Sequence, residues 1–317
     1  MGEGALDLAQ QVRGELARPA PDAAVRLSAA IRERLGDATA AVVFYGSCLR
    51  KDTDEGVLDF YVVVDDYRRA LDSALLASAT AALPPSVFYV ECPGEGGTLR
   101  SKYALLSFDD FARGAAPGGF RTGIWARFCQ PSLAAWARDE PAREALVESC
   151  VQAILTAVET LAPLLEGPAT PEAFWQRAFA ETYEREMRPE SGEKIRALYE
   201  TDPSRYDRVL RGALAELEAR GTFGVRWSGD RFEVELPEAE RARLRSAWRR
   251  RRPLAKLVYV GQLLKTAFTF GDWLPYAAWK VERHTGKPVP YSERQRKYPL
   301  IFGWPILFRI LRDRQLR

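Results

Sequence analysis

Gly46 and Ser47 directly follow a short apolar run, and Asp59 stands near the start of the next one. A glycine lets backbone N–H groups approach phosphate oxygens closely, and a small serine does not obstruct that approach. A carboxylate entering the neighbouring strand can hold a divalent cation against the same phosphates. These residue types, in this order, predict a site for Mg²⁺-dependent nucleotidyl transfer. The alternative is a strand–turn–strand without chemistry, in which Asp59 only caps the end of a strand.

A second metal-binding carboxylate is harder to place. Many nucleotidyltransferases carry a D-x-D pattern, because alternate residues of a strand point to the same face. Here Val57 and Tyr61 occupy the positions two residues before and after Asp59, so this strand supplies one carboxylate. Either the nucleotide itself completes the metal's ligands, or another acidic residue does. The acidic residues nearby in the chain are Asp52, Asp54, Asp65, Asp66 and Glu91.

Two basic residues are candidates for neutralising phosphate charge. Lys102 enters an apolar run shortly after the glycine-rich loop at 94–97. A lysine at that position can serve as the counter-charge for a triphosphate or a lipid phosphate, and a solvated lysine is the alternative. Arg127 lies among apolar residues, where an unpaired guanidinium would be costly. Arg127 is therefore expected to find either a carboxylate partner or a phosphate.

Histidine and cysteine chemistry is not expected. His284 is the only histidine and stands far along the chain, so a Ser-His-Asp or Cys-His mechanism has little support. The four cysteines have no metal-ligand spacing, which favours reduced thiols packed as small core residues in a cytosolic setting. They are Cys48, Cys92, Cys129 and Cys150.

The elements that must position these residues can be read from the hydrophobic pattern. Short runs rich in Val, Phe and Tyr predict four strands of one sheet, at 41–45, 58–64, 86–91 and 103–107. Helical spacing predicts helices over 22–35 and 67–82, and a helical block from 120 to 165 that ends at Gly167-Pro168. The Gly46–Asp59 corner should then lie at one end of this sheet.

A second region follows, with helices expected over 171–186 and 192–220. Alternating residues at 223–227 and 232–236 flank a short Gly-containing turn and predict a β-hairpin. Helices followed by such a hairpin indicate a winged-helix-like module. Its hairpin is surrounded by acidic residues, which disfavours DNA binding. These are Glu233, Glu235, Glu238 and Glu240.

Composition limits the other possibilities. A chain of 317 residues can hold two domains, and 47% hydrophobic residues place it among globular proteins. The net charge of +3 is too small to indicate nucleic acid as a partner. Positive charge concentrates in the C-terminal part, which favours an anionic surface as its partner. We expect no secretory signal peptide and no membrane-spanning helix, because the N-terminus lacks the basic and apolar regions and no apolar run is long enough.

The C-terminal end combines large apolar residues with arginines. A strongly apolar run at 254–270 predicts a helix, and the tail after it is broken by Pro305. The mixture of residues in the tail is typical of a helix that lies in the interface of an anionic bilayer. The alternative is a helix docked on the protein's own core. The residues expected to contact the membrane are Trp304, Phe308, Arg309 and Arg312.

Several short segments together resemble, in order along the chain, those of the mitochondrial-type phosphatidate cytidylyltransferases of the translocator assembly and maintenance protein family. They are YGSCLR at 45–50, VLDFYVVVDD at 57–66, SKYALLS at 101–107, ARFCQP at 126–131 and TYEREMRPESGEK at 182–194. In the last segment Glu186 stands where the family has an Asp, and Arg188 is retained. On spacing alone this segment reads as a charged, solvated helix end. Cys48, Ala104 and Arg185 replace glycines of the family pattern.

The resemblance implies an α+β fold in three parts. A nucleotidyltransferase-like domain with a polymerase-β-type mixed sheet would occupy 1–168. A helical, winged-helix-like domain would occupy 169–253, and an apolar helix with an amphipathic membrane-binding tail would occupy 254–317.

The same resemblance implies CMP transfer from CTP to phosphatidic acid with Mg²⁺, giving CDP-diacylglycerol and pyrophosphate at the inner face of a bacterial membrane. Gly46 and Ser47 would cradle the triphosphate. Asp59 would bind the metal with Glu186 as a further ligand, and the phosphates would be neutralised by Lys102, Arg127 and Arg188. Two other functions stay open: a soluble nucleotidyltransferase that modifies a small molecule, and a non-catalytic membrane-associated homologue. The sequence does not define an oligomeric state.

Overall fold

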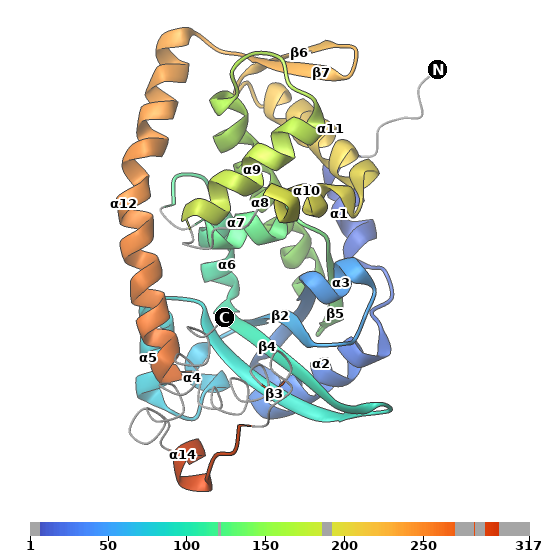
Figure 1. The fold of residues 1–317 in the computed structure, drawn as a ribbon, viewed down its shortest axis with the longest axis vertical. Coiled ribbons are helices and arrows are strands. Elements are labelled where there is room, and N and C mark those ends of the chain that lie inside the picture. The colour runs from blue at the N-terminus through green and yellow to red at the C-terminus, as the bar shows by residue number, and fades with distance from the viewer. Residues whose placement is uncertain (1–6, 120–121, 186–191, 270–281, 283–288, 298–317) are drawn as a thin grey trace.

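The computed structural model describes residues 7–119, 122–185, 192–269, 282 and 289–297. Several residues singled out from the sequence lie outside these ranges. They are Glu186, Arg188, His284, Trp304, Phe308, Arg309 and Arg312. The expected α+β class with a mixed sheet is confirmed (Figure 1).

A five-stranded mixed sheet forms the lower half of the molecule as drawn in Figure 1. Its strands are β1 (Thr39–Tyr45), β2 (Val57–Val64), β3 (Ser86–Gly94), β4 (Gly97–Ser107) and β5 (Ser132–Ala137). The order across the sheet is β3-β4-β2-β1-β5. Strands β2 and β4 are parallel, and the other neighbouring pairs are antiparallel. The four predicted strands are all confirmed as members of one sheet.

Strand β5 corrects the sequence prediction, which treated residues 120–165 as helical. The segment instead forms α7 (Gly123–Phe128), β5 and α8 (Glu140–Leu161). Pro131 has no backbone N–H to donate to a helical hydrogen bond, and the chain after it extends along the edge of β1. The alanines of β5 carry no strong strand signal of their own, so pairing with β1 decides the outcome.

The single helix predicted over 67–82 is a second correction. The structure has two shorter helices there, α4 (Tyr67–Ala70) and α5 (Ala74–Ala82). The break falls where Ser73 adopts an extended conformation and its hydroxyl accepts a hydrogen bond from Leu76 N at 3.3 Å. A serine that caps a new helix competes with continuation of the previous one. The helix predicted over 22–35 is confirmed as α2 (Asp22–Leu35).

Helices cover both faces of the sheet. Alternate residues of β1 and β2, such as Phe44 and Phe60, pack in one core together with α2. The intervening residues, such as Val43 and Tyr61, pack in a second core. That core also holds buried residues of α1 (Leu8–Leu16), α6 (Phe108–Ala115), α7 and α8. By length and composition alone the apolar segment 140–164 could cross a membrane, but about two thirds of its most apolar window is buried inside the protein. It therefore serves as a central core helix.

The second core continues into the other half of the chain. It includes residues from α9 (Pro171–Arg185), α10 (Gly192–Glu200) and α11 (Pro203–Ala219), and from the hairpin of β6 (Gly224–Ser228) and β7 (Arg231–Glu235). Helices followed by a two-stranded hairpin are thus confirmed. The helix predicted over 192–220 is two helices, because Asp202 caps the start of α11 by accepting a hydrogen bond from Arg205 N. Apolar contacts run without interruption from the sheet to these helices, and the domain boundary near residue 168 stays a prediction.

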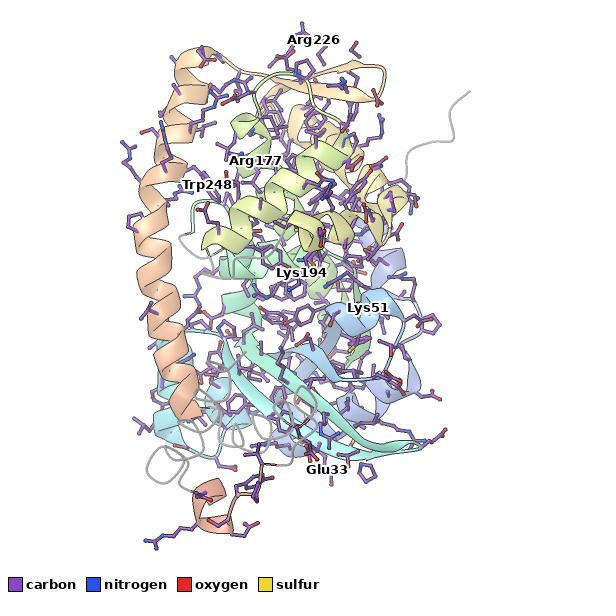
Figure 2. The ribbon with its side chains drawn as sticks, in the orientation of Figure 1. Glu33, Lys51, Arg177, Lys194, Arg226 and Trp248 are labelled. Carbon is purple, nitrogen blue, oxygen red and sulfur yellow. The ribbon has the colours of Figure 1, made fainter. Side chains whose placement is uncertain are left out.

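Helix α12 (Glu238–Thr269) extends along one side of the molecule, from the hairpin to β3 and α5 (Figure 1). Trp248 points inward from it, and its indole N–H donates to Glu181 Oε2 on α9 at 2.9 Å (Figure 2). Further along, Gln262 Nε2 donates to the carbonyl of Pro84 at 2.9 Å. The apolar helix predicted at 254–270 is the C-terminal half of α12. A short helix, α14 (Glu293–Lys297), follows.

Candidate functional site

Strand pairing aligns four side chains in a row across one face of the sheet. Tyr45 on β1 is opposite Asp59 on β2, Asp59 is opposite Lys102 on β4, and Lys102 is opposite Tyr89 on β3. Side chains two residues apart on a strand share a face, so Asp59 lies on the same face as Tyr61. The Tyr61 ring packs 4.9 Å from that of Phe128 on α7, centroid to centroid. The row therefore lies at the end of the face that α7 and α8 cover.

Asp59 and Lys102 form an ion pair within this row. The distance from Lys102 Nζ to Asp59 Oδ1 is 3.1 Å, and the side chains are 18% and 38% exposed for Asp59 and Lys102. Asp59 Oδ1 is buried and accepts no aligned hydrogen bond from the residues that the structure describes, so its contact with Lys102 is electrostatic. A carboxylate held beside one cation and short of hydrogen bonds can accept a second cation.

Gly46 closes the site on the side of β1. Its φ of 92° is a conformation that favours glycine, and a Cβ built there would lie 2.8 Å from Asp59 Oδ2. The backbone thus approaches the carboxylate more closely than any other residue type allows. Ser47 follows as the exposed first residue of α3 (Ser47–Lys51). Gly46, Ser47, Asp59 and Lys102, predicted from separate segments of the sequence, are brought together here.

Arg127 lies on α7, partly buried, and its Nη1 donates to the carbonyl of Gly123 at 2.9 Å. Helix α3 is tied to the end of the same helix. Arg50 Nη1 donates to Gln130 Oε1 at 3.1 Å, and Gln130 Nε2 donates to the carbonyl of Ala126 at 2.9 Å. The helix that carries Arg127 is therefore linked through Arg50 to the corner helix α3.

Two of the acidic residues considered as a second metal ligand have structural roles instead. Asp65 binds Arg138, with Oδ2 2.6 Å from Nη1, beyond the far end of β2 from Asp59. Asp66 caps α4 by accepting hydrogen bonds from the backbone N–H groups of Arg68 and Arg69. Neither carboxylate faces the Gly46 corner.

The remaining acidic residues give no complete metal cage. Asp52 and Asp54 are exposed in the loop after α3. Glu91 is held by the Tyr89 hydroxyl, which donates to Oε1 at 2.6 Å. No cluster of three or more metal-ligating side chains occurs among the residues that the structure describes. Asp59 is thus the carboxylate of this part of the chain that faces the corner, and a divalent ion bound there would need further ligands from a phosphate-bearing substrate.

Sequence reasoning missed a second cation beside the row. Arg100 lies two residues before Lys102 on β4, opposite Val57 on one side and Glu91 on the other. Its Nε is 3.2 Å from Glu91 Oε1, and its side chain is 25% exposed. The sequence R-S-K at 100–102 could have indicated this second cation, because residues two apart on a strand share a face.

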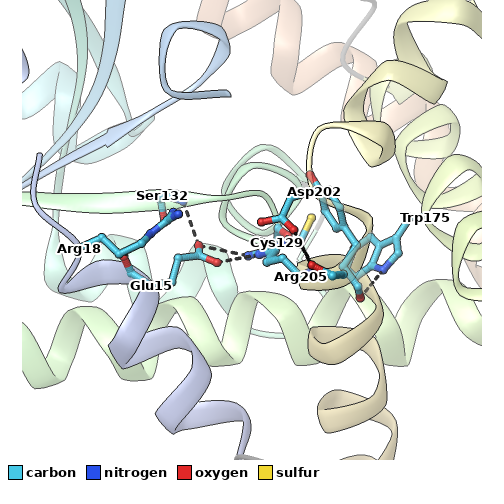
Figure 3. Close-up of polar contacts among 9 residues, drawn as sticks. Glu15, Arg18, Cys129, Ser132, Trp175, Asp202 and Arg205 are labelled. Carbon is cyan, nitrogen blue, oxygen red and sulfur yellow. Dashed lines mark hydrogen bonds and ion pairs between the residues drawn. The ribbon is translucent and has the colours of Figure 1, made fainter. Parts of the chain in front are cut away.

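A buried ion pair lies deeper in the same core and was also missed (Figure 3). Arg205 on α11 binds Glu15 on α1, with Nε 2.7 Å from Oε2, and both side chains are almost fully buried. Arg205 Nη1 also donates to the carbonyl of Cys129 at 2.5 Å, and Glu15 Oε1 accepts from Ser132 N at 2.9 Å. Burial raises the pKa of the Cys129 thiol to about 12. This cluster joins α1, α11 and the connection between α7 and β5.

Compared with known proteins, the chain matches no family model and no curated sequence. The residues of the site are therefore the evidence for a function.

Proposed function

We propose that this protein is a nucleotidyltransferase that transfers CMP from CTP to phosphatidate, with Mg²⁺, to form CDP-diacylglycerol and pyrophosphate. The observation that carries the proposal is the position of Asp59. This carboxylate lies against the backbone of Gly46 on one side and 3.1 Å from the Lys102 ammonium on the other. A carboxylate between a glycine corner and a fixed cation suits a substrate that brings both phosphate groups and a divalent ion.

The protein groups have separate tasks in this mechanism. Gly46 and Ser47 leave room for the triphosphate at the start of α3. Asp59 would hold Mg²⁺, which when bound would neutralise charge on the transferred and departing phosphates. Lys102 orients the reacting phosphates and compensates their charge at a fixed point. The single carboxylate of Asp59 fits such an ion, because Mg²⁺ is commonly bound by one or two carboxylates together with substrate phosphates.

The bond changes require no strong general base. An oxygen of the acceptor phosphomonoester attacks the α-phosphorus of CTP, and the bond from that phosphorus to the bridging oxygen of the β-phosphate breaks. Pyrophosphate leaves with the bonding electrons. The acceptor is ionised near neutral pH, so no proton has to be removed from it. A site whose row offers a carboxylate, a lysine and tyrosines, and no histidine, is compatible with this chemistry.

The choice of CTP and phosphatidate comes from the sequence resemblance. The same source assigns nucleotidyltransferase-like and winged-helix-like folds to the two parts of the chain. Glu186 as a further metal ligand, Arg127 and Arg188 as phosphate ligands, and the tail around Trp304, Phe308, Arg309 and Arg312 as a membrane anchor belong to this proposal. A peripheral position on an anionic membrane would bring the enzyme to its lipid substrate.

The test is pyrophosphate release from each of the four nucleoside triphosphates with Mg²⁺, in the presence and absence of vesicles that contain phosphatidate. The proposal predicts release that depends on both CTP and phosphatidate. Release with a different triphosphate, or without lipid, would keep nucleotidyl transfer and overturn the substrates. Removing the residues after Arg296 should lower activity on vesicles. Unchanged activity would favour a soluble enzyme acting on a small molecule.

One observation favours a second candidate, a membrane-associated homologue without catalysis. Among the described residues, Asp59 has no second carboxylate beside it at the corner. This candidate predicts that the purified protein neither binds CTP with Mg²⁺ in calorimetry nor releases pyrophosphate, while it still binds anionic vesicles. Measurable CTP binding that requires Mg²⁺ would exclude it.

A further inference from the structure

We propose that Arg100 and Lys102 together form the subsite that binds the phosphomonoester of the acceptor. This inference rests on the proposed function and deepens it, because it divides the site into two sides. The Gly46 corner and α3 flank Asp59 on the β1 side, where the triphosphate would lie. Strands β4 and β3 flank Asp59 on the other side, where Arg100 and Lys102 would receive the attacking phosphate.

Strand geometry places the two cations for one anion. Residues two apart on a strand point to the same face with Cα atoms about 7 Å apart. Two long side chains at that separation can converge on a single phosphate group. Both side chains are partly exposed, at 25% for Arg100 and 38% for Lys102. The planar guanidinium of arginine binds phosphate oxygens in pairs, and lysine adds a compact charge with three donors.

The Arg100 side chain contacts Glu91 and the carbonyl of Thr98, which lies two residues from Arg100 in the direction away from Lys102. Glu91 lies directly opposite on β3, with Oε1 3.2 Å from Arg100 Nε. The same oxygen accepts a hydrogen bond of 2.6 Å from the hydroxyl of Tyr89, a residue only 4% exposed and itself opposite Lys102. Arg100 Nη1 also donates to the carbonyl of Thr98 at 3.1 Å. The Tyr89 hydroxyl orients the carboxylate that contacts Arg100, so we interpret Tyr89 and Glu91 as positioning residues.

Lys102 joins the two sides of the site. It contacts Asp59, which would hold the metal, and it follows Arg100 on the same face of β4. An acceptor phosphate bound by both cations would lie next to the metal-bearing carboxylate. The opposite neighbour of Arg100 on β2 is the apolar Val57, and each of the two cations already has one carboxylate partner, Glu91 for Arg100 and Asp59 for Lys102. In the proposed reaction, the anion that bridges the two cations would be the phosphomonoester dianion of the acceptor.

The experiment compares Arg100→Gln with a matched variant, Arg26→Gln. Arg26 also pairs with a carboxylate at 3.2 Å, that of Glu95 in the turn between β3 and β4, and is more exposed than Arg100. We expect Arg100→Gln to raise the KM for the acceptor roughly 10- to 100-fold, as for the loss of a charged hydrogen bond, with the KM for CTP unchanged. Arg26→Gln should change neither. Glu91→Gln should raise the acceptor KM by a smaller factor.

Two acceptors distinguish the source of the phosphate. Phosphatidate in phosphatidylcholine vesicles presents a lipid headgroup, and glycerol 3-phosphate presents the same phosphomonoester in solution. Equilibrium binding of each is measured as well as turnover, so the subsite is tested even if no pyrophosphate is released. Loss of binding in Arg100→Gln, with the wild-type Tm retained, supports the subsite. Unchanged binding, or an equal loss of CTP affinity, would overturn it. No turnover with binding intact would overturn the proposed function alone.

Discussion

Asp59 and Lys102 are direct neighbours across two parallel strands, and their charged atoms meet at 3.1 Å. The register that pairs them continues with apolar pairs, Tyr61 with Ala104 and Val63 with Leu106, all buried in the core. A shift of one residue would exchange the faces of the strand and turn its charged residue towards the core on the opposite side of the sheet. The ion pair is therefore fixed by the packing of the sheet.

Replacing Lys102 by Met tests whether this cation acts in the reaction. The pair is partly exposed, so its loss should cost at most about 1 kcal/mol of the free energy of unfolding. Activity should fall far more, by roughly 100- to 1,000-fold, as for other fixed groups that stabilise transition-state charge. Pyrophosphate release and urea unfolding measure the two effects. A loss of activity no larger than the loss of folded protein would contradict the assignment. Lys102→Arg is the control, because it keeps the positive charge but changes the geometry of the donors.

Replacing Gly46 by Ala tests the close approach at the corner. The new Cβ would lie 2.8 Å from Asp59 Oδ2, on a backbone with a φ of 92°. We expect a loss of roughly 1–2 kcal/mol in stability from the backbone alone, and loss of CTP binding. Gly14→Ala is the matched control, because Gly14 lies inside α1 with nothing within 4 Å of its added Cβ. That variant should be neutral or slightly more stable. Equal behaviour of both variants would refute the close approach.

Much of the fold could be predicted from the sequence, because strands rich in Val and Phe and amphipathic helices such as α2 carry their own periodic signal. Strand β5 could not, since its alanines become a strand only by pairing with β1. At the site, Gly46 and Asp59 are identifiable because they lie close together in sequence. The contact of Asp59 with Lys102 depends on a parallel register that no local pattern encodes.

The pair of Glu15 and Arg205 could not be predicted for the same reason, because its members are 190 positions apart. Removing one partner leaves a buried charge, so Arg205→Met should destabilise the protein by about 3–5 kcal/mol. The double variant Glu15→Leu, Arg205→Met should be less destabilised than the sum of the two single variants. Urea unfolding of all four proteins measures the coupling. If the losses of stability of the two single variants add up to that of the double variant, Glu15 and Arg205 do not stabilise each other.

Stability at alkaline pH should depend on Cys129. Burial raises the pKa of its thiol from 9.0 in the unfolded reference to about 12. Above the unfolded pKa the unfolded chain releases a proton that the folded chain keeps, so stability falls as pH rises towards the folded pKa. Between about pH 8 and about pH 10 this group should cost about 1.4 kcal/mol.

The comparison that isolates this effect is wild type against Cys129→Ala, by urea unfolding at both pH values. Other buried groups, such as Tyr103 with its pKa raised by burial to about 12, lower the stability of both proteins alike. The variant should therefore lose less stability than the wild type over this range. Parallel losses in the two proteins would show that Cys129 ionises as readily in the folded state.

The most direct test of the central claim is pyrophosphate release by Asp59→Ala with CTP, Mg²⁺ and phosphatidate vesicles. Asp65→Ala serves as the control, because Asp65 follows the same strand but binds Arg138 away from the corner. We predict that Asp59→Ala folds normally but releases no pyrophosphate, and that Asp65→Ala releases it as the wild type does. Release by Asp59→Ala at the wild-type rate would contradict the assignment of Asp59 as the metal-binding carboxylate.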